Sequence, residues 1–190
     1  MIKQEIESRL SSILERYQKN FSEKIYVDVY DSTDVLMDAF GITQDIKREN
    51  KQFWGRQLGM CWQLLVVELF RSTCPDFGGA LKFGNDEPCD LVAGKDAIDT
   101  KYRVGSGDSG TLKKFRQYGK LLKDKGYNPV LLFVRGDNLP AAIRACEVGG
   151  WSIHTGKNTF DYIQTKTDFD MYSWLIYHKD NGTFLIDRKQ

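Results

Sequence analysis

The chain has 190 residues, of which 41% are hydrophobic and 28% are charged, an ordinary composition for one globular domain. No apolar run approaches the ~20 residues of a membrane-spanning helix, and the N-terminus lacks a signal-peptide core, so we expect a cytoplasmic protein with no membrane segment. The net charge of +1 does not by itself indicate a polyanionic partner. Four cysteines without a close-set pair argue against a zinc ribbon and a disulfide framework, and predict reduced thiols.

The first 49 residues read as a helical segment that precedes the main body of a single domain. Apolar residues recur at steps of three and four over the first twenty residues, which predicts an amphipathic helix. The run "KIYVDVY" is prone to form a strand. The stretch "STDVLMDAFG" then predicts a short helix that is capped by Ser32 or Thr33 and ended by Gly41.

Residues 50–156 carry the pattern of an α/β core. A long, mostly apolar helix starts near Asn50 and is expected to be buried on more than one side. A loop rich in Pro and Gly, a hairpin, a basic helix, the buried strand "NPVLLFVRG", a further helix and the strand "WSIHTG" follow. This order predicts a mixed central β-sheet flanked by helices. Residues 157–190 form a C-terminal extension, with a helix at "NTFDYIQ" and a terminal hairpin that turns at 180–182.

The hairpin "DLVAGKDAIDTKYR" brings like charges together. Taking Gly94-Lys95 as its two-residue turn places Asp90 opposite Asp99, because each step away from the turn pairs the next two residues. Side chains alternate between the faces of a strand, so Lys101 and Arg103 share the face of the two acids. Directly opposed like charges cost stability, and this cost predicts a compensating cation.

A divalent cation of the magnesium type suits this pair, because Mg²⁺ is usually held by one or two carboxylates together with water and substrate phosphate. Lys101 would lie beside the metal-bound water, where it can orient that water or stabilise charge on an attacked phosphate. A purely structural alternative remains open. In that alternative, Asp99 forms an ordinary surface ion pair with Lys101 or Arg103, which would contribute little to stability.

Asp90, eight intervening residues and then Asp99-Thr100-Lys101 resemble the PD-(D/E)xK nuclease superfamily, which includes most type II restriction endonucleases. The resemblance implies an αβββαβ core, magnesium held by both acids and the Thr100 carbonyl, and a catalytic lysine at position 101. Cys89 stands where the family pattern has proline, although Pro88 lies one position earlier. Within restriction enzymes, the stretch faintly resembles the ApaLI-like group.

The family also tends to carry an acid on the helix that precedes the hairpin. Glu68 interrupts the apolar run "LLVVELF" and is the candidate, as a further metal ligand or as an aid to Lys101. The alternative is a glutamate at the helix edge that reaches solvent.

Contacts with DNA are expected downstream of the catalytic lysine. The candidates are Arg103, then Ser106 and Asp108 in the loop "VGSGDSG", and finally Lys113, Lys114, Arg116 and Gln117 on the basic helix. A flexible connector and an ordinary polar helix face are the corresponding structural alternatives.

These patterns predict a magnesium-dependent type II restriction endonuclease that hydrolyses double-stranded DNA at a specific sequence. A palindromic target would require a homodimer, for which the N-terminal helix is a candidate interface. Two alternatives remain: a structure-specific or repair nuclease of the same superfamily, of the Holliday-junction resolvase type, and a DNA-binding module without turnover.

Overall fold

The computed structural model describes residue 18, residues 32–105 and residues 107–187. The described chain from Ser32 onward belongs to one compact unit. The predicted N-terminal amphipathic helix and the strand-prone run at 24–30 lie outside the described residues. So does the proposed use of that helix as a dimer interface.

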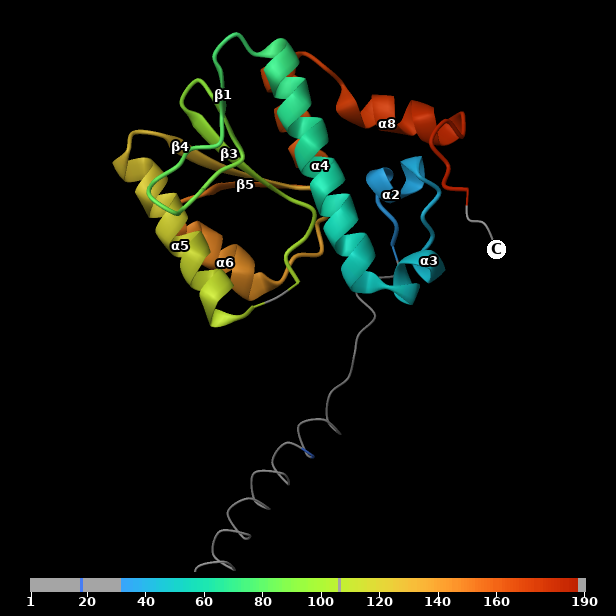
Figure 1. The fold of residues 1–190 in the computed structure, drawn as a ribbon, viewed down its shortest axis with the longest axis horizontal. Helices are drawn as coiled ribbons and strands as arrows, with labels where there is room; N and C mark the ends of the chain where they lie inside the picture. The colour runs from blue at the N-terminus through green and yellow to red at the C-terminus, as the bar shows by residue number, and fades with distance from the viewer. Residues whose placement is uncertain (1–17, 19–31, 106, 188–190) are drawn as a thin grey trace, which may run out of the picture. The chain divides into compact units, whose positions relative to one another are not determined.

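The centre of the unit is a five-stranded mixed sheet in the order β1-β2-β3-β4-β5 (Figure 1). Its strands are β1 (Phe77–Gly79), β2 (Leu91–Ala93), β3 (Asp96–Lys101), β4 (Asn128–Phe133) and β5 (Ser152–Thr155). The first three strands are antiparallel neighbours, whereas β3, β4 and β5 run parallel. The predicted α/β class with a mixed central sheet is therefore confirmed.

Helices cover both faces of this sheet. Figure 1 shows α4 (Lys51–Thr73) on one face and α5 (Ser109–Asp124) with α6 (Pro140–Gly149) on the other. The remaining helices in the described part of the chain are α2 (Val35–Ala39), α3 (Gln44–Glu49), α7 (Lys157–Thr167) and α8 (Met171–Asp180). The succession α4-β1-β2-β3-α5-β4 is the expected αβββαβ order.

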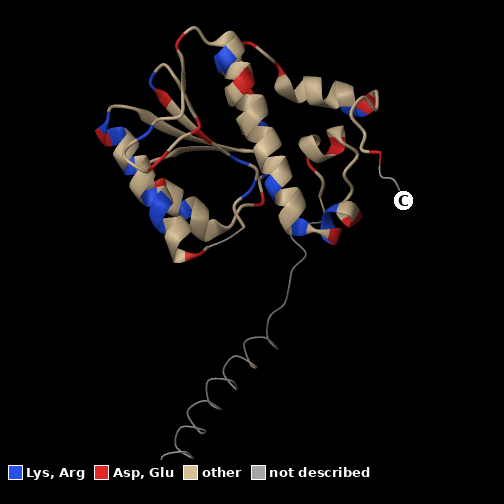
Figure 2. Cartoon of the chain, in the orientation of Figure 1, with Lys and Arg blue, Asp and Glu red and all other residues tan. Residues whose placement is uncertain are grey.

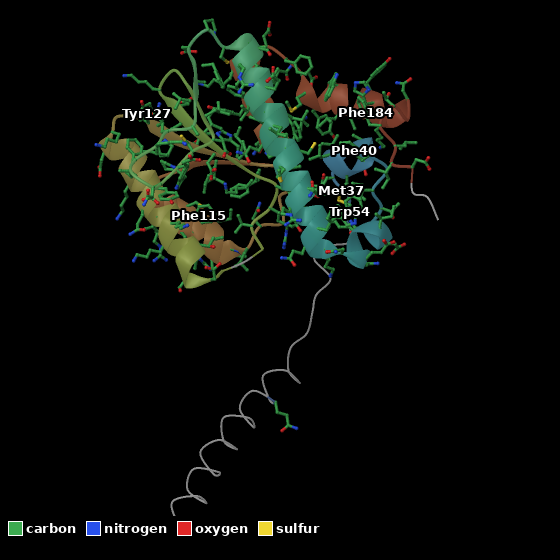
Figure 3. All side chains as sticks on the ribbon, viewed as in Figure 1. Met37, Phe40, Trp54, Phe115, Tyr127 and Phe184 are labelled. Atoms are coloured by element: carbon green, nitrogen blue, oxygen red, sulfur yellow. The ribbon has the colours of Figure 1, made fainter. Side chains whose placement is uncertain are left out.

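The alternation of side chains along β3 and β4 divides the interior into two apolar clusters. Ile98 and Leu132 point into the cluster under α4, whereas Ala97, Leu131 and Phe133 point into the cluster under α5 and α6. Figure 3 shows Phe115 on α5, and this side chain packs in the second cluster. The hairpin therefore has a helix above each of its faces.

Helix α4 is buried along one stripe only, formed by Leu58, Trp62, Val66 and Phe70 at steps of four. Each of these side chains contributes roughly 1.5–3 kcal/mol by leaving water. The expectation that α4 is buried on more than one side was wrong, because Met60 is 53% and Leu64 is 65% exposed. Trp62 also fixes the helix to the sheet through a 3.2 Å hydrogen bond from its ring nitrogen to the Leu132 carbonyl.

The C-terminal extension is helical and belongs to the core. The expected terminal hairpin was wrong, because Met171–Asp180 form α8, whose N-cap Asp170 accepts a 2.9 Å hydrogen bond from the Ser173 amide. Met171 and Leu175 lie four residues apart and are buried in the cluster under α4. This helical spacing buries more apolar surface than an isolated two-stranded ribbon at the chain end would bury.

Two features differ from the sequence expectations. Asp34, rather than Ser32 or Thr33, caps α2 and accepts hydrogen bonds from the Leu36 and Met37 amides. The loop before the hairpin contains β1, which pairs with β2. Helices α2 and α3 lie in the same compact unit as the sheet. In the described part of the chain, no helix has the length and hydropathy required to span a membrane.

Candidate functional site

The β2–β3 hairpin has the register that the turn assignment predicts. Leu91 pairs with Ile98 and Ala93 pairs with Asp96 across the Gly94-Lys95 turn. Gly94 has a φ of 60°, and a Cβ atom at this position would approach the Asp76 carboxylate to 2.7 Å. The turn therefore requires glycine, and this requirement fixes which residues lie beside one another at the open end of the hairpin.

Asp90 lies one residue beyond the last pair of this ladder. One of its carboxylate oxygens, Oδ2, accepts hydrogen bonds from the Thr100 amide at 2.7 Å and the Thr100 hydroxyl at 2.6 Å. The other, Oδ1, accepts a 2.7 Å hydrogen bond from Gln63 Nε2 on α4. The Asp90 carboxylate is thus oriented by three neutral donors, and Gln63 is a contact that sequence reasoning missed.

Asp99 and Lys101 form an ion pair beside Asp90. Lys101 Nζ lies 2.7 Å from Asp99 Oδ1, and the two side chains are 37% and 14% exposed, respectively. Burial raises the pKa of Asp99 to about 6, and the negative charge of Asp90 adds to this effect, although the Lys101 ammonium opposes it. The pKa of Lys101 is lowered by burial but raised overall by the charges of Asp99 and Asp90. We call Asp90, Asp99 and Lys101 the hairpin site.

The Lys101 ammonium also donates a 3.1 Å hydrogen bond to the Thr100 carbonyl, so it bridges this carbonyl and Asp99. A cationic group therefore already lies between two oxygen atoms that were expected to bind metal. Such an oxygen-only set suits a hard cation. Within residues 32–105 and 107–187, no group of three or more His, Cys, Asp and Glu side chains is arranged to hold a metal ion. A hard cation bound to these oxygen atoms would therefore need water or another non-protein ligand to complete its coordination.

Asp99 and Lys101 line a cavity of about 220 Å³ between the hairpin and α5. Thr111, Lys114 and Tyr118 of α5 form the facing wall. The carboxylate of Asp99 is therefore recessed, and solvent reaches it along the side of α5.

Two thiols are buried near the carboxylates. Cys89 and Cys146 are free, as predicted, and burial raises the pKa of Cys89 to about 11 and that of Cys146 to about 12. Both thiols are therefore neutral at physiological pH in the absence of a bound metal ion.

Glu68 lies away from the hairpin site. The buried stripe of α4 faces the sheet, and Glu68 is two residues from both Val66 and Phe70, which corresponds to about 200° around the helix. Its carboxylate pairs with Arg71 at 2.6 Å, and its side chain lines a different hollow, together with Phe169 and Trp174. The expected role of Glu68 as a metal ligand or catalytic acid does not fit this position.

The residues expected to contact DNA separate into two groups. Arg103 pairs with Asp137 at 3.1 Å and is largely buried. Asp108 is the N-cap of α5, where it accepts hydrogen bonds from the amide and hydroxyl of Thr111. These two side chains have structural roles, and Ser106 lies outside the described residues.

The basic face of α5 is exposed, and Figure 2 shows several Lys and Arg residues along α5, whereas most of α4, on the other side of the sheet, is uncharged. Lys114 lines the cavity of the hairpin site, and Gln117 lines the adjoining surface. Lys113 and Arg116 are exposed but line neither hollow.

The signal that identifies Gln63 is its angle around α4. It lies about 60° from Val66 and about 100° from Trp62, at the edge of the sheet-facing stripe, whereas Glu68 lies opposite that stripe.

Comparison with protein-family models, with curated proteins and with solved structures gave no match to this chain.

Proposed function

We propose that the hairpin site hydrolyses DNA phosphodiester bonds with magnesium, as in a type II restriction endonuclease that acts on double-stranded DNA at a specific sequence. The observation that supports this proposal most directly is the recessed Asp99–Lys101 pair beside Asp90. Burial, with a smaller contribution from the charge of Asp90, raises the pKa of Asp99, which is unfavourable for a purely structural ion pair and suits a site that gains a cation.

Each residue has a distinct role in this proposal. Asp90, Asp99 and the Thr100 carbonyl would hold Mg²⁺, which supplies Lewis acidity and lowers the pKa of bound water. Thr100 and Gln63 fix the orientation of the Asp90 carboxylate through the hydrogen bonds described above. Lys101 would release the Thr100 carbonyl, orient a water molecule and stabilise negative charge on the attacked phosphate.

Cleavage of both strands at a palindromic sequence would require a homodimer, because two-fold symmetry of the site matches two-fold symmetry of the protein. One observation favours the alternative of a structure-specific nuclease. Asp99 is recessed in a small cavity, and this geometry is less suited to the surface of an intact duplex than to a distorted or unpaired strand.

Plasmid cleavage in Mg²⁺ and in chelator, followed by sequencing of the product ends, tests the proposal. Asp99→Asn and Lys101→Met should each lower the cleavage rate by at least about 10²-fold, the usual contribution of a general acid–base or electrostatic group. Both should still bind DNA in Ca²⁺. Because Glu68 faces away from the site, Glu68→Gln should cleave at the wild-type rate. Full activity of either hairpin variant, or identical activity in chelator, would contradict the proposal.

A further inference from the structure

A second hollow adjoins the cavity of the hairpin site along α5. This hollow has a volume of about 400 Å³ and is lined by Gln117, Lys120 and Leu121, among others. Lys114 and Tyr118 line both the cavity and the hollow, so they form a shared wall. The four residues Thr111, Lys114, Tyr118 and Leu121 lie at steps of three and four, which places them on one face of the helix. A continuous surface therefore leads from Asp99 outward along α5.

The size of the cavity limits what can reach Asp99. Its volume of about 220 Å³ is below the roughly 300–1,000 Å³ of pockets that enclose a whole small-molecule ligand. It can admit one phosphate with its sugar, but not a base pair. In an intact duplex, each phosphate is fixed at the surface of a double helix whose major groove alone is about 12 Å wide, which is too large a structure to enter this recess. A strand that is not paired at this point can bend its backbone into the recess.

The chemistry of the surface fits such a strand. Lys114 and Lys120 supply positive charge, and the half-buried ring of Tyr118 lies between the cavity and the hollow. A basic groove with an aromatic platform is the arrangement by which proteins bind single strands without reading their sequence. Two acids, Asp86 and Asp124, also line the hollow. Asp86 accepts a 2.7 Å hydrogen bond from the Tyr118 hydroxyl, which fixes the ring at the rim.

We propose that the strand cleaved at the hairpin site is an unpaired DNA strand, which follows α5 over Tyr118 and between Lys114 and Lys120 into the cavity. This inference rests on the proposed phosphodiester hydrolysis, but it favours the structure-specific alternative over cleavage of an intact duplex at a specific sequence. In this proposal, a base of the strand stacks on Tyr118. Lys114 and Lys120 contact the strand, whereas the other basic residues of α5 do not.

Lys123 provides a matched control, because it carries the same charge on the same helix but lies elsewhere. Its side chain packs over Gly150 at the end of α6, where a Cβ atom on Gly150 would lie only 2.4 Å from Lys123 Nζ. Lys123 lines neither hollow. Replacing it removes one positive charge from α5 but leaves the proposed path intact.

The experiment measures fluorescence anisotropy of labelled DNA with full-length protein in Ca²⁺. The probes are a single strand, a splayed fork and a blunt duplex of the same length. The single strand and the fork should bind about tenfold more tightly than the duplex, which is the effect of stacking one base on an aromatic ring. Affinity for the single strand should fall as salt concentration rises, and Lys114→Ala should make the negative slope of log affinity against log salt concentration shallower by about 0.7. Lys123→Ala should produce a smaller change.

Tyr118 supplies the second readout. Tyr118→Phe keeps the ring and loses only the hydroxyl bond to Asp86, so it should bind the single strand like wild type. Tyr118→Ala should lose roughly 5- to 100-fold in affinity, because no ring remains for stacking. Equal or tighter binding of the duplex, or equal effects of Lys114→Ala and Lys123→Ala, would overturn the proposed path.

Cleavage of the same probes in Mg²⁺ separates the two proposals. Cutting of the intact duplex at a rate equal to that of the fork would leave the proposed hydrolysis standing and refute the unpaired-strand path. Tight binding of the single strand through Lys114 and Tyr118 without any cleavage would support the path and refute the hydrolysis. Preferential cutting of the fork in its unpaired arm is the result we expect.

Discussion

Two clusters of charged side chains lie next to each other on β3 and just beyond its end, and they are built differently. The hairpin site places two acids and one lysine beside a cavity, and burial leaves Asp99 with a raised pKa. The second cluster is centred on Arg135, which is 3% exposed and pairs with Asp137 at 2.6 Å and with Asp34 at 3.1 Å. We call Arg135, Asp34, Asp137, Arg103 and Tyr102 the Arg135 cluster.

The members of the Arg135 cluster satisfy one another. Tyr102 donates to Asp34, Arg103 donates to Asp137, and Arg135 also donates to the Ser32 carbonyl at 3.0 Å. Buried charges that are fully paired hold segments of the chain together, and here they fix the start of α2 to the ends of β3 and β4. The hairpin site has an excess of negative charge and an opening. This difference indicates a structural role for the Arg135 cluster and a binding role for the hairpin site.

The largest effect that tests this comparison is expected at Arg135. Arg135→Met removes the shared partner of two mostly buried carboxylates, so it should lower the free energy of unfolding by about 3 kcal/mol. Urea denaturation measures this loss. Arg71→Met is the matched control, since both members of the Arg71–Glu68 pair are more than half exposed and should contribute less than about 1 kcal/mol. Similar losses in the two variants would show that the Arg135 cluster does not stabilise the fold.

The pH dependence of stability should separate Asp99 from an ordinary carboxylate. Its pKa is raised from 3.8 to about 6, so the folded state binds a proton more tightly than the unfolded state does. The contribution of Asp99 is therefore fully present below pH 3.8 and is lost as the pH rises through about 6. The shift of about two units corresponds to at most about 3 kcal/mol.

The measurement compares wild type with Asp99→Asn by urea denaturation between pH 4 and pH 7. The free energy of unfolding of wild type, minus that of the variant, should fall across this range, because only wild type has to ionise a buried carboxyl. A difference that stays constant with pH would show that Asp99 has an ordinary pKa.

Local sequence patterns predicted the elements whose signals do not depend on distant partners. The hairpin register follows from Gly94, the start of α4 from its Asn50 cap, and β4 from a continuous apolar run. The prediction of a hairpin in the region of α8 was wrong, because Asp180-Asn181-Gly182 is an equally good signal for a helix end and for a hairpin turn. Only the burial of Met171 and Leu175 decides between the two structures. Strand β1 has three residues, two of them glycine, so its sequence carries no strand signal. It forms because it pairs with β2.

The contacts of the candidate site within the hairpin were predictable from the sequence, whereas the contacts between the hairpin and the helices were not. Alternation and register place Asp99 and Lys101 together, because both lie on one strand. Which helix residue meets Asp90 depends on the rotation of α4 about its own axis, and packing of its apolar stripe on the sheet sets that rotation. The family resemblance and the interrupted apolar run suggested Glu68, whereas the rotation brings the neutral Gln63 to Asp90.

Gln63 therefore carries the smallest and most specific of the expected effects. Its amide holds one oxygen of Asp90, so Gln63→Ala should weaken Mg²⁺ binding by about 10- to 100-fold, as is usual when a group that orients a metal ligand is lost. Titration calorimetry with Mg²⁺ measures this loss, and unfolding in urea shows whether stability changes with it. Gln57→Ala is the control, because Gln57 lies on the same helix but lines the hollow beside Glu68. Equal Mg²⁺ affinity in the two variants would show that Asp90 needs no support from α4, and the site would then reside in the hairpin alone.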